Sequence, residues 1–144
     1  MKLKLALVLT CNENGSSVKT VPDNSTFEAV FSSLVVQKRI KIQPDQLVAI
    51  NMDANPPEIV WRWLRAVVLE TGGDTVVVDD IKGHPAKVSS VSDLPLTLDL
   101  DDEVWVCGTG RDFEIHDILL KGKPAHPDRL LKYILPIIKE IYQL

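Results

Sequence analysis

The chain is 144 residues long, with 45% hydrophobic and 25% charged residues, a composition close to that of an average globular domain and unlike that of a disordered chain. Its 16 Lys and Arg and 20 Asp and Glu give a net charge of −4 at pH 7. A nonspecific nucleic-acid binder needs a concentrated basic face to neutralise phosphates. The sequence shows no such concentration, so we expect no nucleic-acid partner.

The first ten residues combine a basic start with an apolar run, as signal peptides do. Leucines at positions 3, 5, 7 and 9 nevertheless alternate with other residues, which is the period of a strand. Residues 11–15 read as a turn rather than a cleavage site. No stretch approaches the roughly 20 apolar residues that span a bilayer. We therefore expect no membrane partner and a cytoplasmic or nuclear location.

The predicted elements begin with an N-terminal β-hairpin. Strands at residues 2–11 and 17–21 flank a turn at 12–15. The pair Asn14-Gly15 in this turn tolerates the positive φ that tight hairpins require.

An amphipathic helix is predicted next, over about residues 26–39. Asn24 or Ser25 can cap it, and Glu28 stands three residues after Ser25 as in a capping box. The apolar residues that recur at spacings of three and four are Phe27, Val30, Phe31, Leu34 and Val35. A short apolar strand is expected at residues 47–52.

A second helix is predicted over residues 55–71, starting at two prolines that a first helical turn tolerates. Strands are expected at residues 75–78 and 103–107. The last predicted element is a helix at residues 128–144, whose apolar positions follow a period of 3.6 residues. Pro136 is expected to kink this helix or divide it in two.

The order of hairpin, helix and further strands is typical of the β-grasp arrangement of ubiquitin and its relatives. A hairpin cannot bury its apolar face alone, and the helix at residues 26–39 would cover it. The first and last strands would then lie parallel at the centre of the sheet, which suits the apolar run at residues 5–9. We therefore predict an α+β, ubiquitin-like mixed sheet with a packed helix at residues 1–110, a helical insertion at 54–74 and a helical C-terminal extension at 111–144.

Three segments resemble the ubiquitin-fold modifier family or ubiquitin-like domains in general. Residues 21–30, Val-Pro-Asp-Asn-Ser-Thr-Phe-Glu-Ala-Val, are similar to the Val-Pro, the polar helix cap and the Phe followed by Ala-Val of that family. Residues 47–51 resemble its third strand, and residues 100–106 resemble the last loop and strand of ubiquitin-like domains. The resemblance covers residues 2–53 and, more weakly, 75–110.

The resemblance implies a protein modifier that is processed to a C-terminal glycine and conjugated to target proteins. Gly110 is the candidate for the conjugated residue, with Gly108 second, and a protease would have to remove residues 111–144. The partners would be activating, conjugating and processing enzymes. In the family the tail ends shortly after the last strand, whereas 34 residues follow Gly110 here. Because glycines serve in turns so generally, a simple hinge after the last strand is the favoured interpretation of these two glycines.

The alternative is a ubiquitin-like interaction domain, an adaptor or scaffold that is not conjugated. Trp61 and Trp63 lie about 200° apart around a helix. One of them is therefore expected to be exposed or to contact the C-terminal segment, and an exposed tryptophan can anchor a partner. Leu131 and Ile138 belong to an apolar helix face that packs on its own domain or binds a partner.

No motif indicates catalysis, a metal ion or a cofactor, so we predict that the protein is not an enzyme. The one cluster of metal-capable or acid–base side chains that we weigh as possible chemistry consists of Glu114, His116, Asp117, His126 and Asp128. Their spacing fits no metal motif, and we interpret them as solvated loop residues. Cys11 and Cys107 lack CxxC spacing, which favours reduced thiols. Parallel first and last strands would bring these two cysteines close together.

Overall fold

The computed structural model describes residues 2–21, 23–72, 75–80, 85–90, 100–109, 112–120 and 122–142. The elements in chain order are β1 (Leu3–Cys11), β2 (Gly15–Thr20), β3 (Thr26–Phe31), α1 (Ser33–Gln37), β4 (Leu47–Asn51), β5 (Glu58–Gly72), β6 (Thr75–Asp80), β7 (Pro85–Ser90), β8 (Glu103–Thr109), β9 (Asp112–Leu120), β10 (Lys123–Pro124) and α2 (Pro127–Tyr142). Contacts divide the chain into two compact units. Unit 1 consists of Met1–Arg62 and Pro127–Leu144, and unit 2 of Trp63–His126.

The N-terminal hairpin predicted from the sequence is confirmed by β1 and β2, which pair antiparallel. Asn12 Oδ1 accepts hydrogen bonds from the backbone N–H groups of Asn14 and Gly15, both at 2.9 Å. The backbone N–H of Asn12 donates to the carbonyl oxygen of Gly15, also at 2.9 Å. Asn side chains that bond the backbone two residues further on mimic a turn, so this loop is closed by its own polar groups.

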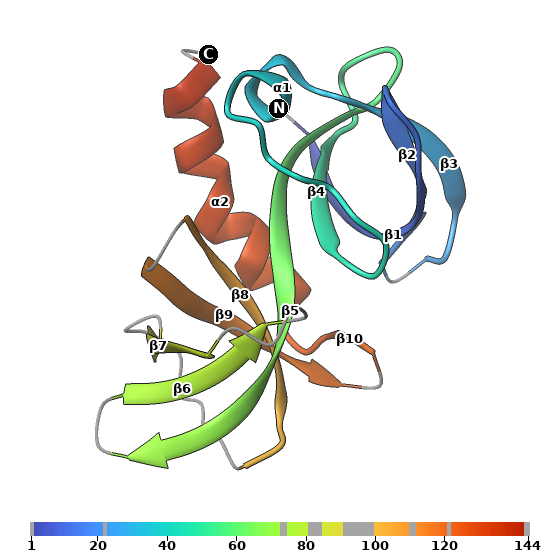
Figure 1. Cartoon of the computed structure of the whole chain (residues 1–144). Coiled ribbons are helices and arrows are strands. Elements are labelled where there is room, and N and C mark those ends of the chain that lie inside the picture. Colours follow the sequence, from blue (N-terminus) through green and yellow to red (C-terminus); the bar gives the residue numbers. More distant parts are fainter. Residues whose placement is uncertain are drawn as a thin grey trace. The chain divides into compact units, whose positions relative to one another are not determined.

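The strands of unit 1 close into a five-stranded barrel. β1 pairs antiparallel with β2 and with β4, and β2 pairs antiparallel with β3. β3 and β5 run parallel, with Val30 opposite Glu58 and Phe31 opposite Ile59, and β5 also pairs with β4. Following these pairings leads from β1 through β2, β3, β5 and β4 back to β1 (Figure 1).

Alternate residues of these strands fill the interior of the barrel. The buried cluster consists of Ala6, Val8, Val18, Ala29, Val35, Ile42, Val48, Ile50 and Ile59. Phe27 and Phe31 of β3 pack against it. Successive side chains of a strand point to opposite faces, so the residues between these positions face outward. The barrel therefore has a core on one side of each strand and a surface on the other.

The helix predicted over residues 26–39 is wrong for most of its length, because β3 occupies the first half and α1 is only five residues long. Phe27, Ala29 and Phe31 reach the barrel core with a period of two. The helix is capped by Ser32, whose hydroxyl accepts a hydrogen bond from a backbone N–H of the first helical turn at 3.3 Å. The apolar spacing at this place fits both periods, and the neighbouring strands decide between them.

The C-terminal helix is confirmed as α2, but it belongs to unit 1 instead of forming an extension of its own. Leu130, Ile134 and Ile138 recur every four residues and are buried. The helix contacts β1. Leu5 of β1 and Leu47 of β4 alternate with core residues and so point away from the barrel interior, yet both are buried. The apolar stripe of α2 therefore covers an outer face of the first barrel.

α2 continues through Pro136 and is not divided there. The proline lies on the exposed side of the helix. Among the described residues, no helix combines the length and the apolarity that crossing a membrane requires.

Unit 2 repeats the strand order of unit 1. β5 pairs antiparallel with β6 and with β8, β6 pairs with β7, and β8 with β9. β7 and β9 run parallel. In each barrel the pairing of the first strand with the second shifts in register, between Val8 and Thr10 in β1 and between Val68 and Glu70 in β5. Such a bulge bends a strand, which allows it to pair with two neighbours.

Both units therefore follow the order 1-2-3-5-4-1 with the third and fifth strands parallel. This is the topology of the oligonucleotide/oligosaccharide-binding (OB) fold, a Greek-key barrel of five strands. β5 serves both barrels, as the fifth strand of the first and the first strand of the second (Figure 1).

The predicted ubiquitin-like α+β fold is wrong. The chain consists mostly of antiparallel strands, and β1 has β2 and β4 as neighbours instead of a parallel last strand. The helical insertion predicted at residues 54–74 is wrong as well, because β5 spans Glu58–Gly72. This segment is rich in aromatic and β-branched residues, which pack well on a pleated surface. Its strand conformation is fixed by pairing with β6, which follows it directly, and with β3, β4 and β8, which are distant in the sequence.

Candidate functional site

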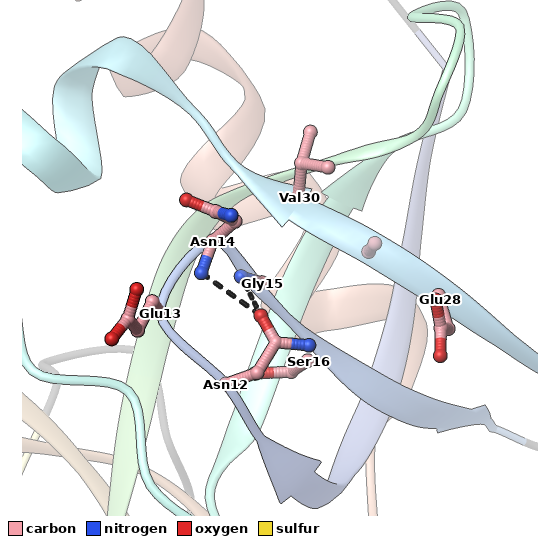
Figure 2. Close-up of a pocket in the computed structure, with 8 residues that line it drawn as sticks. Asn12, Glu13, Asn14, Gly15, Ser16, Glu28 and Val30 are labelled. Carbon is pink, nitrogen blue, oxygen red and sulfur yellow. Dashed lines mark hydrogen bonds between the residues drawn. The ribbon is translucent and has the colours of Figure 1, made fainter.

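A pocket of about 470 Å³ lies at the loop between β1 and β2. Its lining residues are Asn12, Glu13, Asn14, Gly15, Ser16, Glu28, Ala29 and Val30. Figure 2 shows Glu13 and Glu28 on opposite sides of the turn formed by Asn12 and Gly15. OB barrels bind their ligands on the face of strands 2 and 3 and at the loop between strands 1 and 2. The pocket occupies this place in unit 1.

Gly15 allows β2 and β3 to approach each other closely at the pocket. A Cβ atom at this position would lie 2.2 Å from the carbonyl oxygen of Ala29. The loop is also tied to the end of β3, because the backbone N–H of Phe31 donates to the carbonyl oxygen of Asn14 at 2.9 Å. These contacts, together with the hydrogen bonds to Asn12 Oδ1, hold the pocket wall in one conformation.

The pocket lining offers more hydrogen-bond acceptors than donors. Glu13 and Glu28 are exposed and supply carboxylate oxygens, and Asn14 adds an amide. Among the described residues that line the pocket, none is Lys or Arg. An anion such as phosphate is therefore disfavoured inside the pocket, whereas amino groups, including those at the edges of nucleobases, are suitable ligands.

The outward face of β2 and β3 continues from this pocket. Ser17 stands opposite Glu28, and Lys19 stands opposite Thr26. The aromatic residues of β3, Phe27 and Phe31, belong to the core instead, so this face carries no aromatic side chain in the described part of β2 and β3. A ligand on the face would meet polar groups and one lysine, without a stacking platform.

In unit 2 the structure gathers some of the acid–base residues that the sequence places close together. Asp117 is fully buried. Its Oδ2 accepts a hydrogen bond from the backbone N–H of His126 at 2.6 Å, and its Oδ1 accepts one from the backbone N–H of Ile118 at 2.9 Å. His126 Nδ1 lies 2.9 Å from Oδ1, and its side chain is half-exposed. The interpretation of Asp117 as a solvated loop residue is wrong.

His116 is also buried, and its neighbour is one of the predicted interaction residues. Trp63 Nε1 donates a hydrogen bond to His116 Nδ1 at 2.9 Å, and the two rings meet edge to face with centroids 6.4 Å apart. The bond requires a neutral His116 with Nδ1 as an acceptor. The described residues contain no group of three or more His, Cys, Asp or Glu that could hold a metal ion. We read these contacts as the polar framework of the second barrel.

The remaining predicted residues are distributed over both units. Gly108 lies in β8, and Gly110 is outside the described residues. Trp61 is partly exposed on β5, and Trp63 is buried. On α2, Leu131 is partly buried and Ile138 is one of the fully buried residues of the inner face.

Cys11 and Cys107 are both free cysteines. Their expected proximity followed from parallel first and last strands, and this premise is wrong, because β1 pairs with β2 and β4 while β8 pairs with β5 and β9. Cys11 Sγ instead donates to the carbonyl oxygen of Ile42 at 3.4 Å and accepts from Ser16 Oγ at 3.2 Å.

Comparison with known proteins places this chain in no family: no family model matches it, and no match is found among curated proteins. Solved structures that resemble it include the crystal structure of a multidomain protein with nucleic acid binding domains from Streptococcus pneumoniae, with 9% identity and a TM-score of 0.32. The match covers 94% of this chain and 58% of that chain, so this chain spans less than two thirds of that protein. That description names nucleic acid binding domains, in contrast to our expectation of no nucleic-acid partner, but a likeness this distant assigns neither fold nor ligand to this chain.

Proposed function

We propose that the protein is a non-enzymatic binding protein that holds single-stranded nucleic acid on the β2–β3 face of its first barrel. The observation that carries the proposal is the OB strand order of unit 1 with a pocket at the loop between strands 1 and 2. Because one fold hosts many functions, the choice of ligand is argued from the residues of the face itself.

The charge distribution favours unit 1 over unit 2 as the binding surface. Unit 1 carries ten Lys and Arg against eight Asp and Glu, whereas unit 2 carries six against twelve. The net charge of −4 for the whole chain hides this difference. A polyanion is therefore attracted to the first barrel and repelled by the second.

The pocket and the strand face suit different parts of one nucleotide strand. The carboxylates of Glu13 and Glu28 can accept hydrogen bonds from amino groups on a base edge. Lys19 stands on the outward face of β2, where it can contact a phosphate. Without aromatic stacking, which contributes about 1–3 kcal/mol per base where present, the affinity depends mainly on phosphate contacts and falls steeply with salt.

The modifier and adaptor hypotheses were both based on a β-grasp fold, which the chain does not have. Conjugation through Gly110 stays a prediction. Free thiols at Cys11 and Cys107 support a reducing compartment, so the cytoplasm or nucleus remains the proposed location.

The test is fluorescence anisotropy with labelled single strands of about 15 nucleotides, within the site size of OB folds, at about 50 mM salt. We expect Lys19→Glu to weaken binding at least about fivefold, a difference of ~1 kcal/mol. The matched control is Lys132→Glu on the exposed side of α2, which makes the same change in charge. Absence of binding by the unmodified protein, or equal effects of the two variants, would contradict the proposal.

A further inference from the structure

Three cations follow α1 directly and form the most basic segment of unit 1. Lys38, Arg39 and Lys41 are exposed, and no acidic residue lies among them. In the part of the chain that the structure describes, none of the three side chains has an ion-pair partner. We call residues 38–41 the basic turn. A charged residue that is free of internal partners is available for an external one.

The backbone of the basic turn is fixed by a Schellman motif at the end of α1. The N–H of Ile40 donates to the carbonyl oxygen of Val35 at 3.0 Å, and the N–H of Arg39 donates to that of Val36 at 3.2 Å. Ile40 also packs against the core cluster that includes Val35. The turn is therefore held in one conformation while its charged side chains point to solvent.

Arg39 occupies a position in this motif where glycine is the usual residue. Its φ is 52°, in the left-handed region that favours glycine because a Cβ atom is crowded there. An arginine at this place costs stability that glycine would not. The turn thus keeps a cation at a position where the backbone alone favours another residue, which points to a use for the charge.

The basic turn lies at the same end of the barrel as the pocket. Ile42, directly after the turn, is buried in the core cluster, and its carbonyl oxygen accepts the hydrogen bond from Cys11 Sγ. Cys11 in turn immediately precedes Asn12, which lines the pocket. The hydrogen bond between Cys11 and Ile42 therefore links the basic turn to the loop that lines the pocket.

We infer that the basic turn binds phosphate groups of a nucleic-acid strand, next to a base that occupies the pocket. The inference rests on the proposed function and adds a second contact to it. The acceptors of the pocket repel phosphate, so a nucleotide there is bound by its base, and its phosphates need cations outside the pocket. Lys38, Arg39 and Lys41 supply them.

The test measures how binding of the same labelled single strand depends on salt. Each phosphate contact to a single strand contributes about 0.7 to the slope of log affinity against log salt. Replacing Lys38, Arg39 and Lys41 together by Gln is expected to reduce the slope by about 2. The matched control replaces three exposed lysines of the same unit, Lys2, Lys132 and Lys139, by Gln and is expected to leave the slope unchanged.

Arg39→Gly separates binding from folding. In this variant glycine adopts the left-handed conformation without strain, so we expect a higher melting temperature. The variant also lacks one positive charge, so we expect the strand to bind about threefold more weakly. Weaker binding in a more stable protein cannot be the result of unfolding.

Three results would overturn the inference in different ways. If Lys19→Glu weakens binding but the triple variant keeps the original slope, the basic turn is not part of the interface, and the proposed function stands. If the unmodified protein binds no oligonucleotide at low salt, the proposed function and the inference both fail. If the triple variant loses binding to polyglutamate while no oligonucleotide binds, the turn serves an acidic protein instead.

Discussion

Asp117→Asn is expected to destabilise the second barrel, because an amide cannot replace the buried carboxylate. Both oxygens of Asp117 act as acceptors: Oδ1 for the backbone N–H of Ile118 and Oδ2 for that of His126. Asparagine has only one carbonyl oxygen. If it faces Ile118, the amide nitrogen faces the backbone N–H of His126, and two donors meet at a site from which water is excluded.

The magnitude follows from the contacts that are lost. A buried donor left without a partner costs about 1–3 kcal/mol, and a hydrogen bond to a charged group contributes about 1.5–3 kcal/mol. The substitution removes one such bond and leaves one buried N–H unpaired. Since these figures overlap in what they count, we expect the free energy of unfolding to fall by about 3 kcal/mol.

The assay is urea unfolding at constant pH, followed by tryptophan fluorescence. Trp63 and Trp105 are both buried in unit 2 and report on its unfolding. The control is His126→Ala. It removes the contact between the His126 ring and Asp117 but keeps the hydrogen bond from the backbone N–H of residue 126 to Asp117. Its loss in the free energy of unfolding should therefore be smaller, about 1 kcal/mol. A loss of less than about 0.5 kcal/mol for Asp117→Asn, or a larger loss for the control, would refute the assignment of Asp117 as the anchor of this segment.

Three further substitutions test unit 1. Gly15→Ala places a Cβ atom 2.2 Å from the carbonyl oxygen of Ala29. As overpacking does, it should lower the free energy of unfolding by about 3 kcal/mol, measured by chemical unfolding. An unchanged unfolding midpoint would argue against the close approach of β2 and β3. Arg39→Gly should raise stability by about 1 kcal/mol, because glycine adopts the left-handed conformation of this position without the steric strain of a Cβ atom, and a lower melting temperature would argue against that strain. The hydrogen bond from Thr20 lowers the pKa of Asp23 below 3.8, so Asp23 favours folding above this pH, and the contribution is lost as the pH falls through the lower value. Thr20→Val should return the pKa toward 3.8 in an NMR titration, and an unchanged pKa would show that another group is responsible.

Two of the elements that the sequence predicts correctly, the first hairpin and α2, have patterns that are local. The hairpin of β1 and β2 is marked by alternating leucines and by a turn that Asn12 and Gly15 close with their own groups. The apolar stripe of α2 repeats at helical spacing over 16 residues. In both cases the pattern arises from residues a few positions apart that form hydrogen bonds with one another or share one apolar face, so the sequence alone determines the element.

The residues of the candidate site are less visible in the sequence. The pocket consists of polar residues at a turn together with Glu28, which falls in a segment that reads as a helix. The basic turn contains only three cations, which in a chain of net charge −4 do not stand out. A count of Lys and Arg for each barrel separately would have indicated the first barrel, but this count needs the boundary between the units.

The sequence by itself determined the first hairpin, the strands β4, β6 and β8 and the C-terminal helix, because hydrophobic period and turn chemistry act over neighbouring residues. Only the tertiary structure decided that residues 26–31 and 58–72 are strands. Phe27, Ala29 and Phe31 acquire a period of two when β3 lies between β2 and the parallel β5, whose partner residues are some 28 positions further along the chain. Barrel closure favours this pairing because it gives each of the five strands of the first barrel two neighbours. These contacts join residues far apart in the sequence, so no local pattern contains them.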